Sequence, residues 1–327
     1  MAERERRRIL RVLLAGAVTA TTLVVTGGTG AAAPAAGTRA AAVGLTGLQR
    51  VESPVVTNSV SPKTARAVCP SSKKVVGGGG WAYMPSANGH PERLALTRLE
   101  PSDDVLGTGS NAGPDGYRVG AAEVGDDAVG SWWLQAYALC ADAASVPGWE
   151  LERASGPLQR SDEVQRVPVG CDTADTAKRV LGTGAAIETS SQGQGQVVLQ
   201  VARVSADGRL VRAQAHEDAT TYGLTWHLDA YAICADAPSG FTVATGRSPQ
   251  AGSETEKFAH AGCPAGTRLL STGAAITDEA PAHVALQQVY PRPNGRSMDA
   301  QAVENAPYFD TWDFIVARAT CAVAEPE

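Results

Sequence analysis

The amino-acid sequence predicts an all-β protein made of three tandem antiparallel β units, each closed by a disulfide. Composition, a threefold internal repeat and six cysteines support this prediction. Only 19% of the 327 residues are charged and 5% are aromatic, whereas glycine is frequent at 35 residues. This composition excludes a disordered chain, a coiled coil and a helical bundle rich in Glu, Lys and Leu. It suits many short strands joined by turns.

Three motifs recur in the same order along the chain. An opening cysteine precedes an aliphatic pair and a glycine-containing turn, in residues 69–81, 171–187 and 263–276. A short apolar stretch follows, in residues 94–96, 197–199 and 284–286. A closing Trp-to-Cys motif occupies residues 132–142, 226–236 and 312–322. The repeats therefore span residues 45–155, 156–247 and 248–327, after an export signal at 1–36 and a linker at 37–44.

Glycine occupies one equivalent position in all three repeats, at Gly79, Gly184 and Gly273. We expect it to provide a positive φ or a close approach of two backbones at a strand bend. A phosphate-binding loop is excluded, because such a loop needs Lys and Ser or Thr after its last glycine, followed by a helix.

Each repeat has two cysteines at matched positions, which in an exported chain indicates disulfides. The repeat selects one pairing from the fifteen that six cysteines allow: Cys69–Cys140, Cys171–Cys234 and Cys263–Cys321. Each bridge lies within one repeat, so we expect each unit to close without its neighbours. The cysteine spacing does not resemble a zinc site, and no metal or cofactor is expected.

Alternation of apolar and polar residues predicts the strands. Even positions of residues 226–234 are Trp, Leu, Ala, Ala and Cys, as in a half-buried strand. Further strands are predicted at residues 94–99, 117–124, 197–204 and 210–215. One more strand, at residues 149–154 and 241–245, has no counterpart after Cys321, where the chain ends. Turn-forming clusters separate the strands, giving five to seven per unit.

The Cys-Pro-x-Gly motif, the glycine-rich turn and the Ala-Tyr-Ala-x-Cys ending resemble a repeat in uncharacterised exported proteins of actinobacteria. The likeness covers nearly all of the chain after the export signal and implies no activity. More distantly, three disulfide-closed β units resemble the vitelline-membrane outer layer protein family. That resemblance implies a β-prism-like fold, with three sheets in a pseudo-threefold arrangement. Units of that family are shorter, and three consecutive β-sandwiches are the alternative.

The first 36 residues have the order of an export signal: five arginines, an apolar run and a tail of small residues. Residues 6–11 also resemble the twin-arginine export motif, and the choice between the two export routes stays open. A membrane anchor is disfavoured, because the apolar run is shorter than the roughly 20 residues that a span needs. The protein is therefore expected to be secreted and extracellular.

The net negative charge of the chain limits which partners it can attract. The full chain has a formal charge of −6, and the part after residue 36 has 23 Lys and Arg against 32 Asp and Glu. An acidic chain of this kind argues against nucleic acid and against anionic membranes as partners. A glycan or a surface protein is the expected partner, and the oligomeric state stays open.

No catalytic motif is recognisable. The five histidines have no metal-ligand spacing, and no Ser lies in a G-x-S-x-G elbow. The carboxylate pairs Asp103–Asp104 and Asp126–Asp127 are sequence neighbours, whose side chains point to opposite faces of a strand. The sequence favours a non-enzymatic binding protein over its two alternatives, an extracellular hydrolase without a known motif and a structural envelope protein.

Ligand-binding candidates come from the first repeat. Trp81, Tyr83 and Trp149 have no Trp counterparts in the other repeats, and Trp81 and Tyr83 precede a polar loop, residues 86–93, that contains His90. Aromatic faces beside polar groups are suited to sugar stacking. The alternative is that Trp81 points into the core, as Ala186 and Ala275 would at nearby repeat positions.

Export can be tested directly. Mass spectrometry of the culture medium should find a mature N-terminus between residues 34 and 43, because the small-residue tail provides the cleavage site. Protein that keeps Met1 inside the cell, with none in the medium, would refute the export signal.

Overall fold

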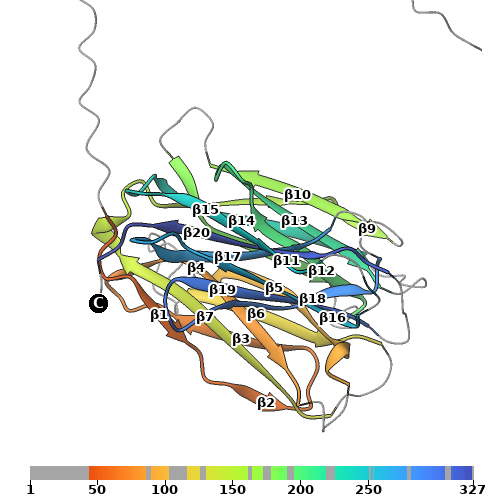
Figure 1. The fold of residues 1–327 in the computed structure, drawn as a ribbon. Helices are drawn as coiled ribbons and strands as arrows, with labels where there is room; N and C mark the ends of the chain where they lie inside the picture. Colours follow the sequence, from red (N-terminus) through yellow and green to blue (C-terminus); the bar gives the residue numbers. More distant parts are fainter. Residues whose placement is uncertain are drawn as a thin grey trace, which may run out of the picture. The chain divides into compact units, whose positions relative to one another are not determined.

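The fold is all β, as expected, with the strands arranged in three antiparallel sheets (Figure 1). The computed structural model describes residues 44–85, 90–102, 116–125, 130–160, 164–171, 178–189, 195–218, 225–249, 252, 254–277, 281–305 and 311–325. The strands belong to the compact unit 41–327. The export signal at residues 1–36, the linker up to residue 43 and the carboxylate pairs at 103–104 and 126–127 lie outside the described residues.

Sheet I contains seven strands. Its order is β3 (Lys63–Val68), β6 (Gly116–Glu123), β5 (Leu94–Ser102), β11 (Lys178–Thr189), β14 (Thr225–Asp236) and β8 (Glu150–Ser155). The two-residue strand β9 (Gln159–Arg160) also pairs with β14.

Sheet II contains six strands. Its order is β10 (Gln165–Gly170), β13 (Leu210–Glu217), β12 (Val197–Val204), β17 (Arg268–Ile276), β20 (Ile315–Ala322) and β15 (Thr242–Arg247).

Sheet III contains seven strands. Its order is β16 (Glu256–Gly262), β19 (Ser297–Glu304), β18 (Val284–Pro291), β4 (Lys73–Tyr83), β7 (Trp132–Asp142) and β1 (Gln49–Glu52). The short strand β2 (Val56–Asn58) also pairs with β7. Two 3₁₀ turns, η2 (Pro91–Arg93) and η3 (Ala143–Ser145), complete the described elements.

Every sheet combines strands from two repeats. Sheet I takes β3, β5 and β6 from the first repeat and β11 and β14 from the second; sheets II and III repeat this pattern with the next pair of repeats. This topology confirms the pseudo-threefold, β-prism-like expectation and rules out three consecutive β-sandwiches. It also corrects the expectation that each repeat closes by itself, because each repeat supplies strands to two sheets.

The strand that has no counterpart after Cys321 is replaced by β1, from the N-terminal part of the first repeat. β1 pairs with β7 at the position that β8 and β15 occupy beside β14 and β20. Next to it, Leu45 forms a parallel bridge with Ala324, and the Leu45 N–H donates to the Val323 carbonyl at 3.0 Å. The N-terminal segment thus completes sheet III, which the C-terminal repeat alone would leave one strand short.

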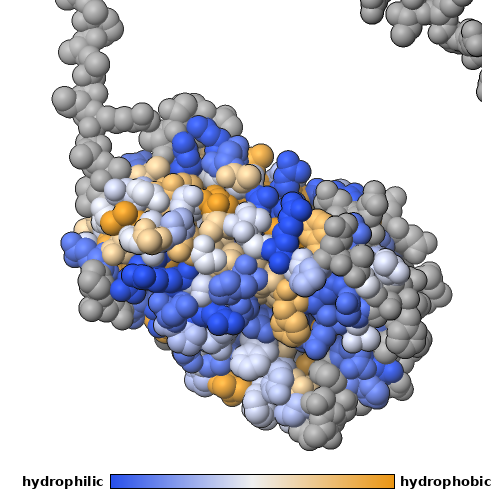
Figure 2. All heavy atoms as spheres, in the orientation of Figure 1, coloured by the Kyte–Doolittle hydropathy of each residue, from blue (hydrophilic) through white to orange (hydrophobic). Residues whose placement is uncertain are grey.

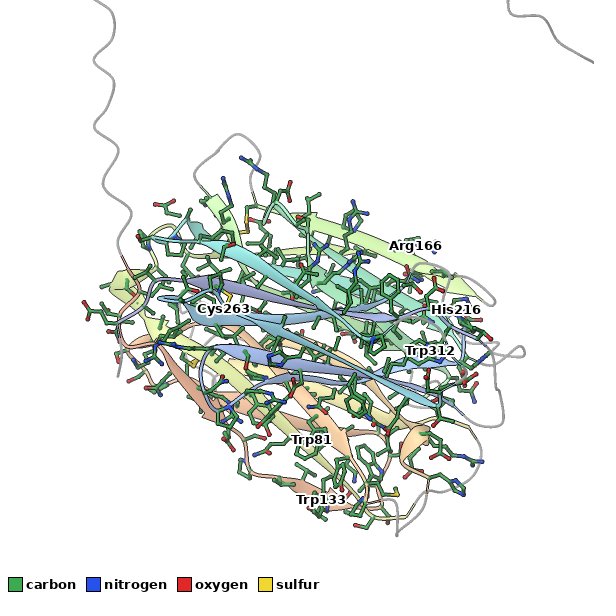
Figure 3. All side chains as sticks on the ribbon, viewed as in Figure 1. Trp81, Trp133, Arg166, His216, Cys263 and Trp312 are labelled. Carbon is green, nitrogen blue, oxygen red and sulfur yellow. A yellow bond between two sulfur atoms is a disulfide. The ribbon has the colours of Figure 1, made fainter. Side chains whose placement is uncertain are left out.

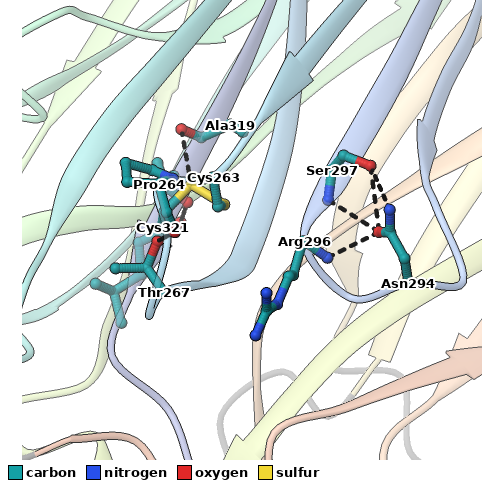
Figure 4. Close-up of a disulfide and its surroundings, with 10 residues drawn as sticks. Cys263, Pro264, Thr267, Asn294, Arg296, Ser297, Ala319 and Cys321 are labelled. Atoms are coloured by element: carbon teal, nitrogen blue, oxygen red, sulfur yellow. Dashed lines mark hydrogen bonds between the residues drawn. A yellow bond between two sulfur atoms is a disulfide. The ribbon is translucent and has the colours of Figure 1, made fainter.

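The three expected disulfides are formed, and each joins two sheets. Cys69 follows β3 of sheet I and bonds Cys140 on β7 of sheet III. The pairs Cys171–Cys234 and Cys263–Cys321 join sheet II to sheet I and sheet III to sheet II; Figure 4 shows the last. Cα–Cα distances are 5.6–5.8 Å, as is usual for disulfides. The bridges therefore cross-link the sheets in a ring.

The repeated tryptophans Trp132, Trp226 and Trp312 are buried where neighbouring sheets meet. Lys63 on β3 donates to the Trp132 carbonyl at 2.6 Å, and Lys257 makes the same contact with Trp312. In the second repeat a glutamine replaces the lysine and donates to the Trp226 carbonyl at 3.2 Å. We number the five equivalent strands of each repeat from first to fifth as β3–β7, β10–β14 and β16–β20. Buried backbone acceptors need such partners, so these bonds hold the first strand of each repeat against the start of the fifth.

The second strands of the repeats, β4, β11 and β17, pack against one another. A Cβ atom at Gly182 would lie 2.3 Å from the Val76 carbonyl oxygen, and one at Gly77 would lie 2.4 Å from the Leu270 carbonyl oxygen. The third repeat has Ser271 at this position, and its hydroxyl accepts a hydrogen bond from the Thr183 N–H at 3.4 Å. Backbones this close leave room only for glycine or a small hydrogen-bonding side chain.

The matched glycines Gly79, Gly184 and Gly273 also mark close approaches. A Cβ at these positions would lie 2.1, 2.7 and 2.9 Å from backbone carbonyl oxygens of the adjacent third strands. None of the three has a positive φ. These glycines therefore permit a close approach of neighbouring backbones and do not provide a positive φ.

Replacing Gly182 by alanine should destabilise the protein by roughly 2–3 kcal/mol, because the new methyl would overlap backbone atoms of β4. Chemical denaturation of the oxidised protein measures the change. Gly262→Ala is the matched control, since a Cβ there would meet only one atom, at 3.8 Å. Equal stability of the two variants would contradict the tight packing of the second strands.

Candidate ligand-binding site

The outer faces of the three sheets differ chemically at equivalent positions. A row of cross-strand neighbours passes through Gly184 in sheet I, Gly273 in sheet II and Gly79 in sheet III. In sheet I the row includes Arg118, Glu100, Tyr231 and Arg153. In sheet II it includes Arg212, Arg203, Arg318 and Thr245. In sheet III it includes Asp299, Tyr290, Tyr137 and Glu52. One framework thus presents ion pairs, arginines and aromatic rings on three separate faces.

Sheet III carries a continuous cluster of aromatic side chains, which we call the aromatic face. Its members come from three neighbouring strands: Trp81 and Tyr83 on β4, Trp133 and Tyr137 on β7, and Tyr290 on β18. Ring centroids lie 5.0 Å apart for Trp81–Tyr83, 5.4 Å for Tyr83–Trp133, 6.1 Å for Trp81–Tyr290 and 5.0 Å for Tyr137–Tyr290. These spacings are typical of contacting aromatic pairs.

Strand alternation places four of these rings outside the core, whereas Tyr137, at the edge of the cluster, is buried. Gly80 faces inward, since a Cβ there would meet the Val119 side chain, so Trp81 faces outward. Likewise Trp132 is fully buried, whereas its neighbour Trp133 is 40% exposed. Trp81, Tyr83 and Tyr290 are partly exposed. Figure 3 shows Trp81 and Trp133 near each other, and Figure 2 shows pale, weakly polar atoms at the same place.

Polar groups lie at the border of the aromatic face. The Arg50 guanidinium lies 4.5 Å from the Tyr137 ring centroid and 5.4 Å from that of Tyr290, and its Nη2 donates to the Tyr290 hydroxyl at 3.3 Å. Burial, together with Tyr290, raises the pKa of Tyr137, so its hydroxyl stays protonated and donates to Gln135 Oε1 at 2.6 Å. Gln135 donates in turn to Glu52 Oε2 at 3.2 Å. This network fixes the edge of the face.

The structure brings together two of the three residues that the sequence proposed. Trp81 and Tyr83 are in contact on β4. His90 lies just before η2, where its Nδ1 is 2.8 Å from Glu92 Oε1 and its side chain is 62% exposed. Residues 86–89 of the expected loop lie outside the described residues. The candidate site therefore extends from Trp81 and Tyr83 across sheet III and is not defined by that loop.

Sequence reasoning missed Trp133, Tyr137 and Tyr290. Trp133 had a usable signal, because it follows the repeated Trp132 and must point to the opposite face of the same strand. Tyr290 had none: it lies more than 200 positions from Trp81, and only the pairing of β18 with β4 joins them. Ala186 and Ala275, the equivalents of Trp81, are buried on the other sheets.

Sheet I has an open pocket of about 400 Å³ on its outer face. Its polar lining comes from β3, β5 and β6 and includes Lys63, Thr64, Arg66, Arg98 and Arg118. Arg98 is ion-paired with Glu100 at 2.5 Å and Glu188 at 2.6 Å, and Lys63 donates to backbone carbonyls. Because these cations already have partners, the pocket is a weaker candidate than the aromatic face.

Among the described residues, no group of three or more His, Cys, Asp or Glu side chains is arranged to hold a metal ion. In the same part of the chain, no helix is long and apolar enough to cross a membrane.

Asp218, just after β13, is a carboxyl group with a strongly perturbed pKa. Burial raises its pKa to about 6, and the nearby Asn305 amide offsets this in part. Perturbed carboxyl groups are frequent at catalytic sites, but the cause here is burial beside a neutral amide. The raised pKa of Asp218 is therefore best tested by measuring how protein stability depends on pH.

Comparison with known proteins identifies no relative: no protein-family model matches the chain, and no curated protein sequence is significantly similar to it.

Asp218→Asn should stabilise the protein at pH 7 by roughly 2–3 kcal/mol and have little effect near pH 4. The folded-state pKa is raised, so the wild-type carboxyl destabilises the fold increasingly as pH rises from about 4, its unfolded pKa, to about 6. Urea unfolding at several pH values measures this. Asp207→Asn is the control. Because the Ser205 hydroxyl holds the Asp207 pKa low, this variant should instead lose stability at pH 7. Unchanged pH dependence in Asp218→Asn would disprove the assignment.

Proposed function

We propose that the protein is a secreted, non-enzymatic binding protein that recognises a glycan on an extracellular surface through the aromatic face. The observation that carries the proposal is the cluster of five rings assembled from β4, β7 and β18. Four of these rings are partly exposed, on strands whose opposite faces form the core.

The chemistry of the cluster supports a glycan. Sugar rings present apolar C–H surfaces that stack on aromatic faces, while their hydroxyls need hydrogen-bonding groups nearby. The aromatic face offers both, since Gln288 lies directly across from Trp81 and Gln135 lies on its other side. Aromatic side chains also lose little conformational entropy on binding, especially when strand pairing and ring contacts already hold them.

The framework supports binding in an extracellular setting. All six cysteines form disulfides that cross-link the three sheets. Disulfides of this kind persist in oxidising compartments outside the cytosol. Together with the export signal expected at residues 1–36, they support secretion. A rigid scaffold that presents side chains from several strands is a frequent arrangement for recognition.

The test is a glycan array of the mature protein, followed by titration of the best glycan with variants. Trp81→Ala and Tyr290→Ala should each weaken binding about tenfold, as expected from losing roughly 60 Å² of apolar contact at about 25 cal/mol per Å². Phe258→Ala is the matched control, because Phe258 is 51% exposed at the far edge of the same sheet. It should bind like the wild type.

Two outcomes would contradict the proposal. One is glycan affinity that Trp81→Ala and Tyr290→Ala leave unchanged. The other is cleavage of the bound glycan, detected as new reducing ends, which would identify the protein as a hydrolase.

A further inference from the structure

Sheet II has an unusual distribution of charge. Each of its six strands contains one arginine, and none contains lysine: Arg166, Arg212, Arg203, Arg268, Arg318 and Arg247. The same strands contain a single carboxylate, Glu217, which is buried and accepts a hydrogen bond from the Trp226 indole at 2.5 Å. In a protein with a net charge of −6, this sheet is therefore a local concentration of positive charge.

Strand register places the central arginines on the outer face. Arg203 and Arg212 are direct cross-strand partners, so their side chains project from the same side. Arg318 is the partner of Gly273 on the next strand, and a Cβ at Gly273 would lie 3.4 Å from the Cβ of Arg203. Gly273 thus separates the two arginines without a side chain of its own, which leaves bare backbone between them.

Arg247 extends the cluster to the edge strand. It pairs with Val316, two residues from Arg318 on β20, and therefore shares its face. Arg212 and Arg247 are exposed, and Arg247 lies 4.7 Å from the ring centroid of Phe314. At the other edge, Arg166 on β10, labelled in Figure 3, donates to Gln214 at 2.9 Å. We call Arg203, Arg212, Arg247 and Arg318 the arginine face.

Equivalent rows on the other sheets contain carboxylates that the arginine face lacks. Where sheet II has Arg203, sheet I has Glu100, which pairs with Arg98 at 2.5 Å. Where sheet II has Arg212, sheet III has Asp299, which pairs with Arg292 at 2.5 Å. The strands of sheet II have an arginine, and no carboxylate, at each of these two positions.

The pKa of Arg318 reflects the closeness of the other arginines. Burial lowers the pKa of Arg318, and Arg212 and Arg247 lower it further by like-charge repulsion, which Asp207 partly opposes. The Arg318 Nη1 donates to the Val204 carbonyl at 2.9 Å, which fixes the guanidinium. Its Nε is buried and has no hydrogen-bond partner among the described residues. Assembled like charges of this kind would gain stability from an added anion.

We propose that the arginine face binds an acidic polysaccharide, whose carboxylate or sulfate groups pair with Arg203, Arg212, Arg247 and Arg318. Guanidinium groups match such planar or tetrahedral oxyanions with two parallel hydrogen bonds. This site is separate from the aromatic face, and the proposal does not depend on the function assigned to that face.

Charge spacing favours a polysaccharide over nucleic acid. The four arginines lie on β13, β12, β20 and β15, which with β17 between them span about 19 Å across the sheet. That spacing is roughly one positive charge per 5 Å, whereas duplex DNA carries one negative charge per about 1.7 Å.

The test is titration of the mature protein with polygalacturonate and with dextran sulfate, which separate carboxylate from sulfate recognition. Neutral dextran and single-stranded DNA are the comparison polymers. Binding to at least one acidic polysaccharide should weaken with added salt, because each ion pair releases counterions. The double variant Arg212→Gln/Arg247→Gln should lose at least about tenfold in affinity, a modest effect for two charge-assisted hydrogen-bonding groups.

Arg296→Gln is the matched control, because it removes an exposed arginine from the β18–β19 connection of sheet III. It should bind like the wild type, and so should Trp81→Ala, whose effect is confined to the aromatic face. The proposal is overturned by equal affinity of Arg212→Gln/Arg247→Gln and the wild type, by no binding to either acidic polysaccharide, or by tighter binding to single-stranded DNA. None of these results would bear on glycan binding by the aromatic face.

Discussion

Close packing of three glycine-containing strands is the constraint on which the rest of the fold depends. β4, β11 and β17 approach until a single added carbon at Gly182 would overlap the backbone of β4. Strands this close cannot carry ordinary side chains between them, so each sheet begins at this contact and extends away from it. Thr183 and Thr272 then donate across it, to the carbonyls of Thr272 and Gly78, and satisfy buried backbone acceptors.

Exchange of strands between repeats follows from that arrangement. Each second strand pairs with the fifth strand of its own repeat and with the third strand of the preceding one, so every sheet is built from two repeats. The disulfides reinforce the exchange, because every bridge spans two sheets. β1 closes the ring by taking the place that a strand after Cys321 would have occupied. Stability is therefore shared by the three repeats and is not a property of any one of them.

Chemical differences between the three sheets arise at the positions that packing constrains least. Inward positions are limited to small or apolar residues by packing, but outward positions are free to change. The row through Gly79 carries tyrosines, the row through Gly184 carries ion pairs, and the row through Gly273 carries arginines. A single repeated architecture can in this way present three chemically different surfaces, because the outer residues of one sheet do not take part in the packing of another.

The sequence by itself determined the repeat, the all-β class and the disulfide pairing, because matched spacing and period-two alternation are local properties. It also identified Trp81 and Tyr83 as residues that break the symmetry of the repeat. Tertiary structure alone decided which repeat pairs with which, where β1 inserts, and that Tyr290 joins Trp81 on one face. The reason is physical: pairing between strands from different repeats depends on how the three second strands pack together, and no local pattern encodes the neighbour that each strand will meet.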